Sequence, residues 1–204
     1  MCVVLLNGEG FNVDSLERKT LAAFLEEVRS EQAKHGRFIS DVCCDGVSLN
    51  IREEEDMGDL TLNNFEELKV TYSSPEDIIF ESLQNNDEVS ATLSEVLTEV
   101  SEKFRLGVVN EVVEEFIQSL EHVEAFLQIV NHIRNFMDDQ GQEESVTEME
   151  NFIKQFLEIS NEMLEAQNED DYVLLADLLE YEVVPLLQDW ENISGQVREL
   201  LAAA

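Results

Sequence analysis

Apolar and polar residues alternate in two different ways along the chain, and the change falls near residue 73. Before it, short apolar runs alternate with period two and stop at turn residues, which is typical of β-strands. After it, apolar residues recur every three or four positions over long stretches, which predicts amphipathic helices. The pattern therefore predicts an α+β protein with two domains, residues 1–73 and 74–204.

The first domain begins with a predicted hairpin around Asn7-Gly8, a pair that tolerates the positive φ angles of a type I′ turn. Folding about this turn predicts three facing pairs, which are Leu6–Glu9, Val4–Phe11 and Cys2–Val13. The register puts five side chains on one core-facing side: Cys2, Val4, Leu6, Phe11 and Val13.

A helix, a second hairpin and a final strand follow in the first domain. Thr20 is the predicted N-cap of the helix and Gly36 its stop, with Leu21, Phe24, Leu25 and Val28 as its apolar side. The second hairpin turns at Asp45-Gly46. Its predicted apolar face consists of Phe38, Val42, Cys44, Val47, Leu49 and Ile51. After the acidic loop 53–56, residues 68–72 are the predicted last strand.

This order of hairpin, helix, short hairpin and final strand resembles the β-grasp fold of ubiquitin and the small sulfur-carrier proteins. The resemblance rests on residues 3–9, 45–49 and 60–62 leading into 68–70. Carrier members of that family end in a flexible Gly-Gly tail, whereas here Ser73-Ser74-Pro75 follows the last strand. The resemblance therefore implies recognition or docking rather than conjugation.

Turn and capping residues divide the second domain into four long predicted helices. Ser74-Pro75 begins the first, Gly107 and Gly141 separate the next two, and Asp170 or Asp171 caps the fourth. Residues 145–148 read Ser-Val-Thr-Glu, a capping box that predicts the start of the third helix. Short connections favour antiparallel neighbours, so the prediction is an up-and-down bundle.

Two positions are expected to disturb these helices. Residues 84–87 are a weak spot where the first helix can bend or break. Pro185 should kink or divide the last helix, because it cannot donate to the carbonyl of Tyr181. The second helix is apolar over an unusually wide arc. Predicted core positions include Val89, Leu93, Val96, Ile117, Leu120, Leu157, Leu164, Leu174 and Trp190.

The charge of the chain is strongly negative, with 46 acidic and 12 basic residues and a formal net charge of -34. Residues 74–204 contain 31 of these acids against 5 bases, a net of -26. Such a charge repels nucleic acid and anionic membranes and suits a basic protein partner. The plainer interpretation is that the acids coat the solvent-facing sides of the helices.

The three cysteines form no even-numbered disulfide framework, which points to a reducing, cytoplasmic compartment. The N-terminus has no basic lead and does not resemble a signal peptide. Cys43 and Cys44 are adjacent strand residues that point to opposite faces, so they cannot chelate one metal together. We expect a thiol reagent to label Cys43 in the folded protein and Cys44 only on unfolding.

Few residues offer catalytic, cofactor or metal chemistry. Gly8-Glu9-Gly10 lacks the third glycine and the following helix of a dinucleotide site. His35, His122 and His132 form no Glu-x-x-His pair, so we expect no di-iron site, no other metal and no cofactor. The best enzymatic candidate is the cluster beside Pro185, which contains Asp177, Glu180, Tyr181 and Glu182. The plainer interpretation is the wet face of an amphipathic helix.

The favoured hypothesis is a non-enzymatic cytoplasmic interaction protein, an adaptor or chaperone-like holder of a basic or amphipathic partner helix. The wide apolar arc of the second helix also permits a homodimer. One alternative is an acidic mimic of nucleic acid that blocks a DNA- or RNA-binding protein. Another is an enzyme with a carboxylate site near Pro185.

Overall fold

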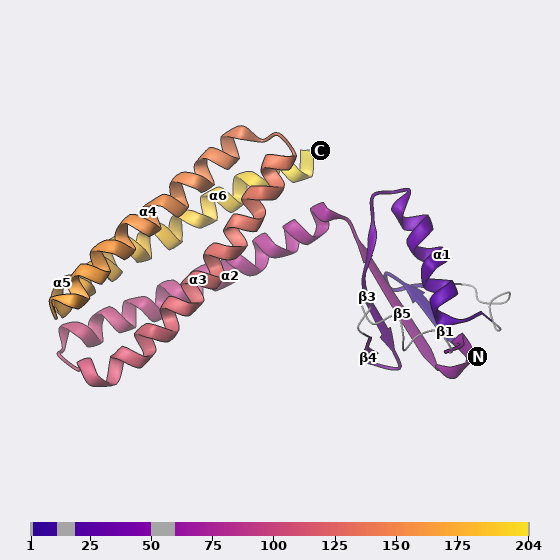
Figure 1. The fold of residues 1–204 in the computed structure, drawn as a ribbon, viewed down its shortest axis with the longest axis horizontal. Coiled ribbons are helices and arrows are strands. Elements are labelled where there is room, and N and C mark those ends of the chain that lie inside the picture. The colour runs from indigo at the N-terminus through magenta and orange to yellow at the C-terminus, as the bar shows by residue number, and fades with distance from the viewer. Residues whose placement is uncertain (1, 12–18, 50–59, 204) are drawn as a thin grey trace. The chain divides into compact units, whose positions relative to one another are not determined.

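The computed structural model describes residues 2–11, 19–49 and 60–203, except for the side chains of residues 110 and 111. The chain forms two compact units, residues 1–78 and 79–204, which are described separately below. The first unit combines a mixed sheet with one helix, and the second consists of four long packed helices (Figure 1). The predicted α+β class is therefore confirmed. The predictions for Val13, Ile51 and the loop 53–56 lie outside the described residues.

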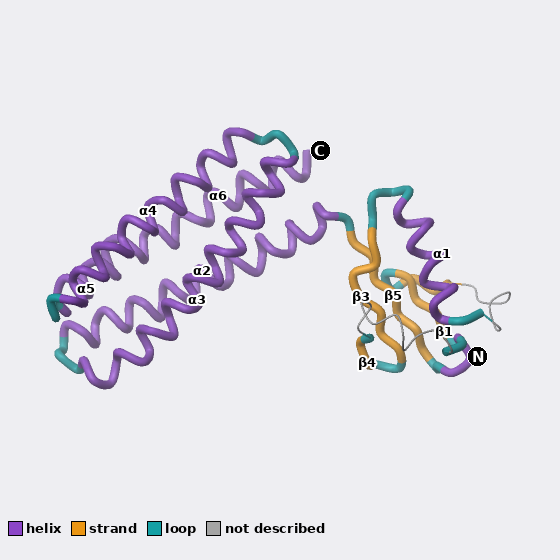
Figure 2. Tube along the Cα trace, in the orientation of Figure 1, coloured by secondary structure: helices purple, strands orange, loops and turns teal. Residues whose placement is uncertain are grey.

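Five strands form the sheet of the first unit (Figure 2). They are β1 Val3–Leu6, β2 Glu9–Phe11, β3 Phe38–Cys44, β4 Val47–Ser48 and β5 Glu67–Ser73. Their order in the sheet is β2-β1-β5-β3-β4, with β1 parallel to β5 and the other neighbouring pairs antiparallel. Both predicted turns are confirmed, because Leu6 faces Glu9 and Cys44 faces Val47.

Helix α1, Leu21–Ala33, covers the core of this unit with the four side chains that its periodicity predicted. The Thr20 hydroxyl accepts a hydrogen bond from the Ala23 amide at 3.3 Å, which confirms the predicted N-cap. The helix packs on Val4, Val42 and Val70 of the central strands. A short 3₁₀ helix, η2 Leu62–Asn64, adds the buried side chain of Leu62.

Two residues of the predicted apolar face of the second hairpin are on the surface instead. The pairing of β3 with β5 shifts between Ile39 and Asp41, so Ser40 is an extra residue. The shift reverses the side-chain alternation, and Ile39 packs on the core while Phe38 is 41% exposed. Val47 is 65% exposed because it lies on β4, a two-residue strand at the edge of the sheet.

Four long helices form the second unit, and the last of them is divided. They are α2 Pro75–Arg105, α3 Val109–Asp139, α4 Glu143–Asn168, and α5 Tyr172–Leu178 continuing through η3 Leu179–Val183 into α6 Val184–Ala203. Short turns reverse the chain between the long helices, with positive φ at Gly107 and Gly141 as expected (Figure 1). Among the described residues, no helix is both long and apolar enough to cross a membrane.

The structure corrects two of the predicted helix features and explains a third. Helix α2 is uninterrupted through residues 84–87, where Asn86 is buried and Asp87 pairs with Arg198 of α6. Helix α4 begins at Glu143 rather than at the predicted box, because Ser145 is already inside the first turn and buried. The last helix is divided by the π-helical segment η3, which ends two residues before Pro185 and contains Tyr181, whose carbonyl Pro185 cannot bond.

The core of the second unit is aromatic at its centre. Trp190, whose burial is confirmed, packs against Phe126 and Phe152 with ring centroids 5.6 and 5.7 Å apart. Phe156 extends the cluster, 5.2 Å from Phe152. Seven of the predicted core positions are instead exposed to at least 36%: Val89, Val96, Ile117, Leu120, Leu157, Leu164 and Leu174. Six of these residues lie on two helix pairs: Val89 and Val96 border α3 from α2, and Ile117, Leu120, Leu157 and Leu164 lie on α3 and α4. These two exposed apolar regions are candidate binding surfaces.

Candidate functional site

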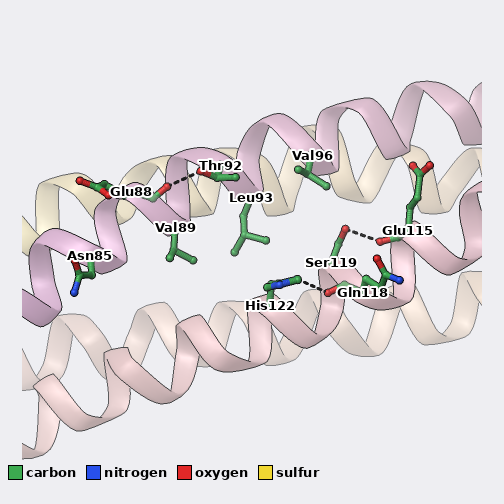
Figure 3. Close-up of a pocket in the computed structure, with 10 residues that line it drawn as sticks. All are labelled: Asn85, Glu88, Val89, Thr92, Leu93, Val96, Glu115, Gln118, Ser119 and His122. Carbon is green, nitrogen blue, oxygen red and sulfur yellow. Dashed lines mark hydrogen bonds between the residues drawn. The ribbon is translucent and has the colours of Figure 1, made fainter. Parts of the chain in front are cut away.

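A groove of about 690 Å³ separates α2 from α3 along part of their length (Figure 3). It lies within the second unit and is bordered by two antiparallel helices. The groove is lined by Asn85, Glu88, Val89, Thr92, Leu93, Val96, Glu115, Gln118, Ser119 and His122.

The α2 wall of the groove has an apolar strip beside the polar side chains of Asn85, Glu88 and Thr92. Val89, Leu93 and Val96 point from α2 toward the gap, at spacings of four and three residues that place them on one side of the helix (Figure 3). Leu93 is 5% exposed and forms the floor, whereas Val89 and Val96 are 36% and 38% exposed and border the opening. This wall has the size and spacing of an anchor site for an apolar side chain of a guest.

The α3 wall is polar, and its side chains are held by their own helix. Ser119 donates to the Glu115 carbonyl at 2.7 Å, and His122 Nδ1 lies 2.7 Å from the Gln118 carbonyl (Figure 3). A carbonyl oxygen only accepts, so Nδ1 of His122 carries a hydrogen and donates this bond. This wall therefore offers hydrogen-bonding groups opposite the apolar wall.

Two carboxylates lie on the borders of the groove. Glu88 is on α2 and Glu115 on α3, and Glu115 pairs with Lys103. The hydrogen bond that Lys103 donates to Glu115 raises the pKa of Lys103, so this lysine is charged at neutral pH. Glu88 has no ion pair among the described residues. The opening is therefore bordered by negative charge.

Helix α2 also turns small polar side chains toward the bundle, away from this groove. Ser90 and Ser94 are buried there, and Ser90 donates to the Leu187 carbonyl at 2.6 Å. A second groove, of about 480 Å³, runs along the other side of α2 beside Leu187 and Trp190. Ser90 and Ser94 line this second groove, and serines fill less space than leucines would.

The predicted carboxylate cluster near Pro185 is part of an ion-pair network. Arg105, at the end of α2, donates to Asp177 at 2.7 Å and also to Glu180. Its guanidinium carbon lies 5.3 Å from the ring centroid of Tyr181, and the hydrogen bond to Asp177 raises its pKa. Arg105 thus brings Asp177, Glu180 and Tyr181 together, while Glu182 is exposed. The position of Arg105 explains why these acids lie close together, and no substrate is needed to account for it.

The histidines and cysteines are separated in the structure. His35 lies in the first unit, where it lines a small pocket with Arg37 and Tyr72, His132 is exposed on α3, and His122 lines the groove between α2 and α3. All three cysteines are free, with Cys2 and Cys44 buried and Cys43 partly exposed. Burial and the neighbouring Asp45 raise the pKa of Cys44 to about 11, so its thiol is protonated at neutral pH. Within the described ranges, no group of three or more potential ligands could hold a metal ion.

Sequence reasoning missed Arg105 and assigned Val89 and Val96 to the core. Helical periodicity alone does not separate the buried arc of a helix from its border. The inward serines of α2 gave no reliable signal either. Val89, next to the buried Ser90, is 36% exposed on the border of the groove, whereas Val100, next to the buried Ser101, is fully buried in the core.

Residues 81–193 match the family model described as "Domain of unknown function (DUF8042)". This range contains the whole groove and the Arg105 network. Neither the comparison with curated proteins nor that with solved structures gave a match. Because the matched range covers more than half of the 204 residues, the chain belongs to the DUF8042 family.

Proposed function

We propose that the protein is a non-enzymatic interaction module that binds a basic amphipathic helix of a partner protein. The observation that carries this proposal is the groove between α2 and α3, with one apolar wall, one polar wall and an acidic border. An amphipathic helix has the matching division of its surface. The function is that of an adaptor or of a chaperone-like holder.

The charge of the molecule supports a basic guest. The net charge of -26 over residues 74–204 attracts Lys- and Arg-rich segments and accelerates their association. Exposed carboxylates such as Glu88 lie where the polar face of a guest would emerge from the groove. The same charge opposes binding to nucleic acid or to anionic membranes.

A non-enzymatic role is supported by the Arg105 network. Asp177 and Glu180 were the strongest catalytic candidates of the sequence, and both accept hydrogen bonds from Arg105. Both carboxylates are thus engaged by Arg105 rather than left open toward a substrate. The proposal therefore includes no cofactor and no metal.

The first unit is proposed to be a β-grasp domain used for docking. Its strand order β2-β1-β5-β3-β4, with parallel β1 and β5 and the single helix α1, supports this. Helix α2 begins two residues after β5, so no flexible tail is available at that point for conjugation. Three free thiols support a cytoplasmic location.

The test is binding of a fluorescent helical peptide with leucines on one side and lysines on the other to the full chain. We expect affinity that falls as salt is added, and a loss of about tenfold in the double variant Val89→Asp, Val96→Asp. Val173→Asp is the matched control, because Val173 is 61% exposed on α5 and outside the groove. Equal affinity of the double variant and this control would refute the groove as the binding site.

The acidic-mimic hypothesis remains a separate prediction with its own readout. A mimic must compete with duplex DNA or RNA for a basic nucleic-acid-binding protein, and its effect should survive the groove substitutions. The proposed helix-binding function instead predicts that Val89→Asp, Val96→Asp weakens the interaction about tenfold, although the net charge becomes more negative. The two hypotheses therefore predict opposite results for the same variant.

A further inference from the structure

The outer side of the α3–α4 seam has an exposed apolar surface that is separate from the groove. Leu157 and Leu164 on α4 are 59% and 56% exposed, and Leu120 on α3 is 38% exposed. Ile117, 48% exposed, lies one turn from Leu120. Four large side chains with this exposure on two neighbouring helices need an explanation, since single exposed leucines are ordinary but clusters are not.

An ion pair fixes how these residues face one another. Arg134 of α3 donates to Glu150 of α4 at 2.8 Å, which marks the positions where the outer edges of the two helices meet. Seven residues make nearly two helical turns, so positions seven apart lie on the same side of a helix. Leu127 and Leu120 lie seven and fourteen residues before Arg134.

The same spacing occurs on the other helix. Leu157 and Leu164 lie seven and fourteen residues after Glu150. Because α3 and α4 run antiparallel, Leu127 lies level with Leu157, and Leu120 level with Leu164 (Figure 1). We call Leu120, Leu127, Leu157 and Leu164 the leucine row. Leu127 is partly buried against the core and forms its base.

We infer that the leucine row is a second docking surface, which takes a basic amphipathic helix lying along the α3–α4 seam. A seven-residue leucine spacing on two antiparallel helices forms the surface into which a third helix packs its own a and d side chains. The row and the groove lie on opposite sides of α3, because the groove faces α2 and the row borders α4. The bundle is therefore bivalent and can hold two helices at once.

Charge selects a basic guest over a second copy of this chain. Exposed Glu124 follows Leu120 by one turn, and exposed Glu158 and Glu165 directly follow the two leucines of α4. The cations near this border are themselves paired, since Arg134 bonds Glu150 and Lys154 lies 3.6 Å from Glu158. Pairing two copies through the row would bring these carboxylates together, whereas lysines flanking the apolar side of a guest would neutralise them.

The experiment uses the full chain and a peptide of about three heptads, with leucine at positions a and d and lysine at the flanking positions. A benzophenone side chain replaces one d leucine, so that irradiation records where the peptide lies. We expect crosslinks to α3 and α4 along the row. We also expect Leu157→Asp, Leu164→Asp to lower the affinity of the row by about tenfold or more.

Two controls separate this inference from the proposed function, which rests on different residues. The double variant Val89→Asp, Val96→Asp makes the groove unsuitable for an apolar side chain. It should leave the crosslinks to the row unchanged. Both substituted leucines are more than half exposed, so the row variant should keep its Trp190 fluorescence and helical circular dichroism. A peptide with glutamate in place of lysine should not bind, and added salt should weaken the lysine peptide.

Two results would overturn the inference. The first concerns the Val89→Asp, Val96→Asp background, in which the groove is altered: crosslinks that fall outside α3 and α4, or that persist unchanged when Leu157→Asp, Leu164→Asp is added. The second is a dimer in sedimentation that strengthens with salt, excludes the peptide and disappears in the same double variant. That second result would identify another copy of this chain as the occupant of the row.

Discussion

Helices α2 and α4 are both long, acidic and amphipathic, yet they fill the bundle with different side chains. The side that α4 buries is large and apolar, with Met149, Phe152, Phe156 and Met163. The side that α2 buries alternates leucines with small polar residues: Asn86, Ser90, Ser94 and Ser101. Grooves border α2 on both sides. The spacing of apolar residues predicts where a helix lies. The size of its inward-facing side chains decides how tightly the neighbouring helices pack against it.

The largest expected difference between the two helices is the cost of truncating a buried residue to alanine. Phe156 on α4 is 2% exposed and packs on Phe152 and Phe126, so Phe156→Ala should lower the free energy of unfolding by about 3–5 kcal/mol. Ser94 on α2 is also buried, but Ser94→Ala should change it by less than about 1 kcal/mol, since the hydroxyl only bonds the Ser90 carbonyl within the helix.

Urea unfolding followed by circular dichroism and by the fluorescence of Trp190, the one tryptophan of the chain, measures both costs. If Phe156→Ala does not fold, Phe156→Leu should still show a smaller loss in the same direction. Similar costs for the serine and the phenylalanine would mean that α2 packs as tightly as α4, and the comparison would fail.

A smaller effect of opposite sign is expected at Asn86. Its side chain is fully buried on α2, and neither amide atom has a hydrogen-bond partner. Leucine has a similar size, a higher helix propensity and no polar group to desolvate. Asn86→Leu should therefore raise the free energy of unfolding by about 1–3 kcal/mol. The neighbouring Asn85 borders the groove and is exposed, so Asn85→Leu should change stability by less than about 0.5 kcal/mol.

Thermal unfolding of the two variants side by side provides the measurement. A destabilised Asn86→Leu variant would show that the amide is needed inside the bundle. A stabilised Asn86→Leu variant would show that a buried polar side chain on α2 lowers the stability of the bundle. The large apolar side chains that α4 buries carry no such cost. Measuring the affinity of Asn86→Leu for the helical peptide would show whether the buried amide is needed for binding in the groove.

The two helices also show how far the sequence can predict this molecule. Turn pairs such as Asn7-Gly8 act locally, and so they predicted the hairpins and their register correctly. The start of α4 was misplaced, because Ser145 fits a capping box locally but is needed in the core. The extra residue Ser40 had no signal in the strand pattern, and it reversed the exposure of Phe38.

The candidate site was less predictable than the fold for a physical reason. Val96 and Leu157 occupy apolar positions that fit the helical period, and only the placement of neighbouring helices decides that they border solvent. Arg105 lies 72 residues before Asp177 and 75 before Glu180, so no local pattern links them. Properties that depend on contacts within one helix could be predicted, whereas those that depend on contacts between helices could not.

The smallest expected difference concerns how the two helices begin. At the start of α2, the Ser74 hydroxyl accepts from the Asp77 amide at 3.1 Å, and the Ser74 amide donates to the Asp77 carboxylate at 2.9 Å. At the start of α4, Gln142 makes no such bond through its side chain. Ser74→Ala should therefore cost about 1 kcal/mol, and Gln142→Ala less than about 0.5 kcal/mol.

The pH dependence of this cap follows from the Asp77 carboxylate. The hydrogen bond from the Ser74 amide favours the charged form and lowers the pKa of Asp77 below its ordinary value of 3.8. A lowered carboxyl pKa stabilises the folded state above that ordinary value, and the stabilisation is lost as the pH falls through the lowered folded pKa. Asp77→Asn should thus destabilise the start of α2 at pH 7 and have no further effect in strong acid. Amide exchange of residues 76–79 in both variants at several pH values would test this, and a pH-independent effect would contradict it.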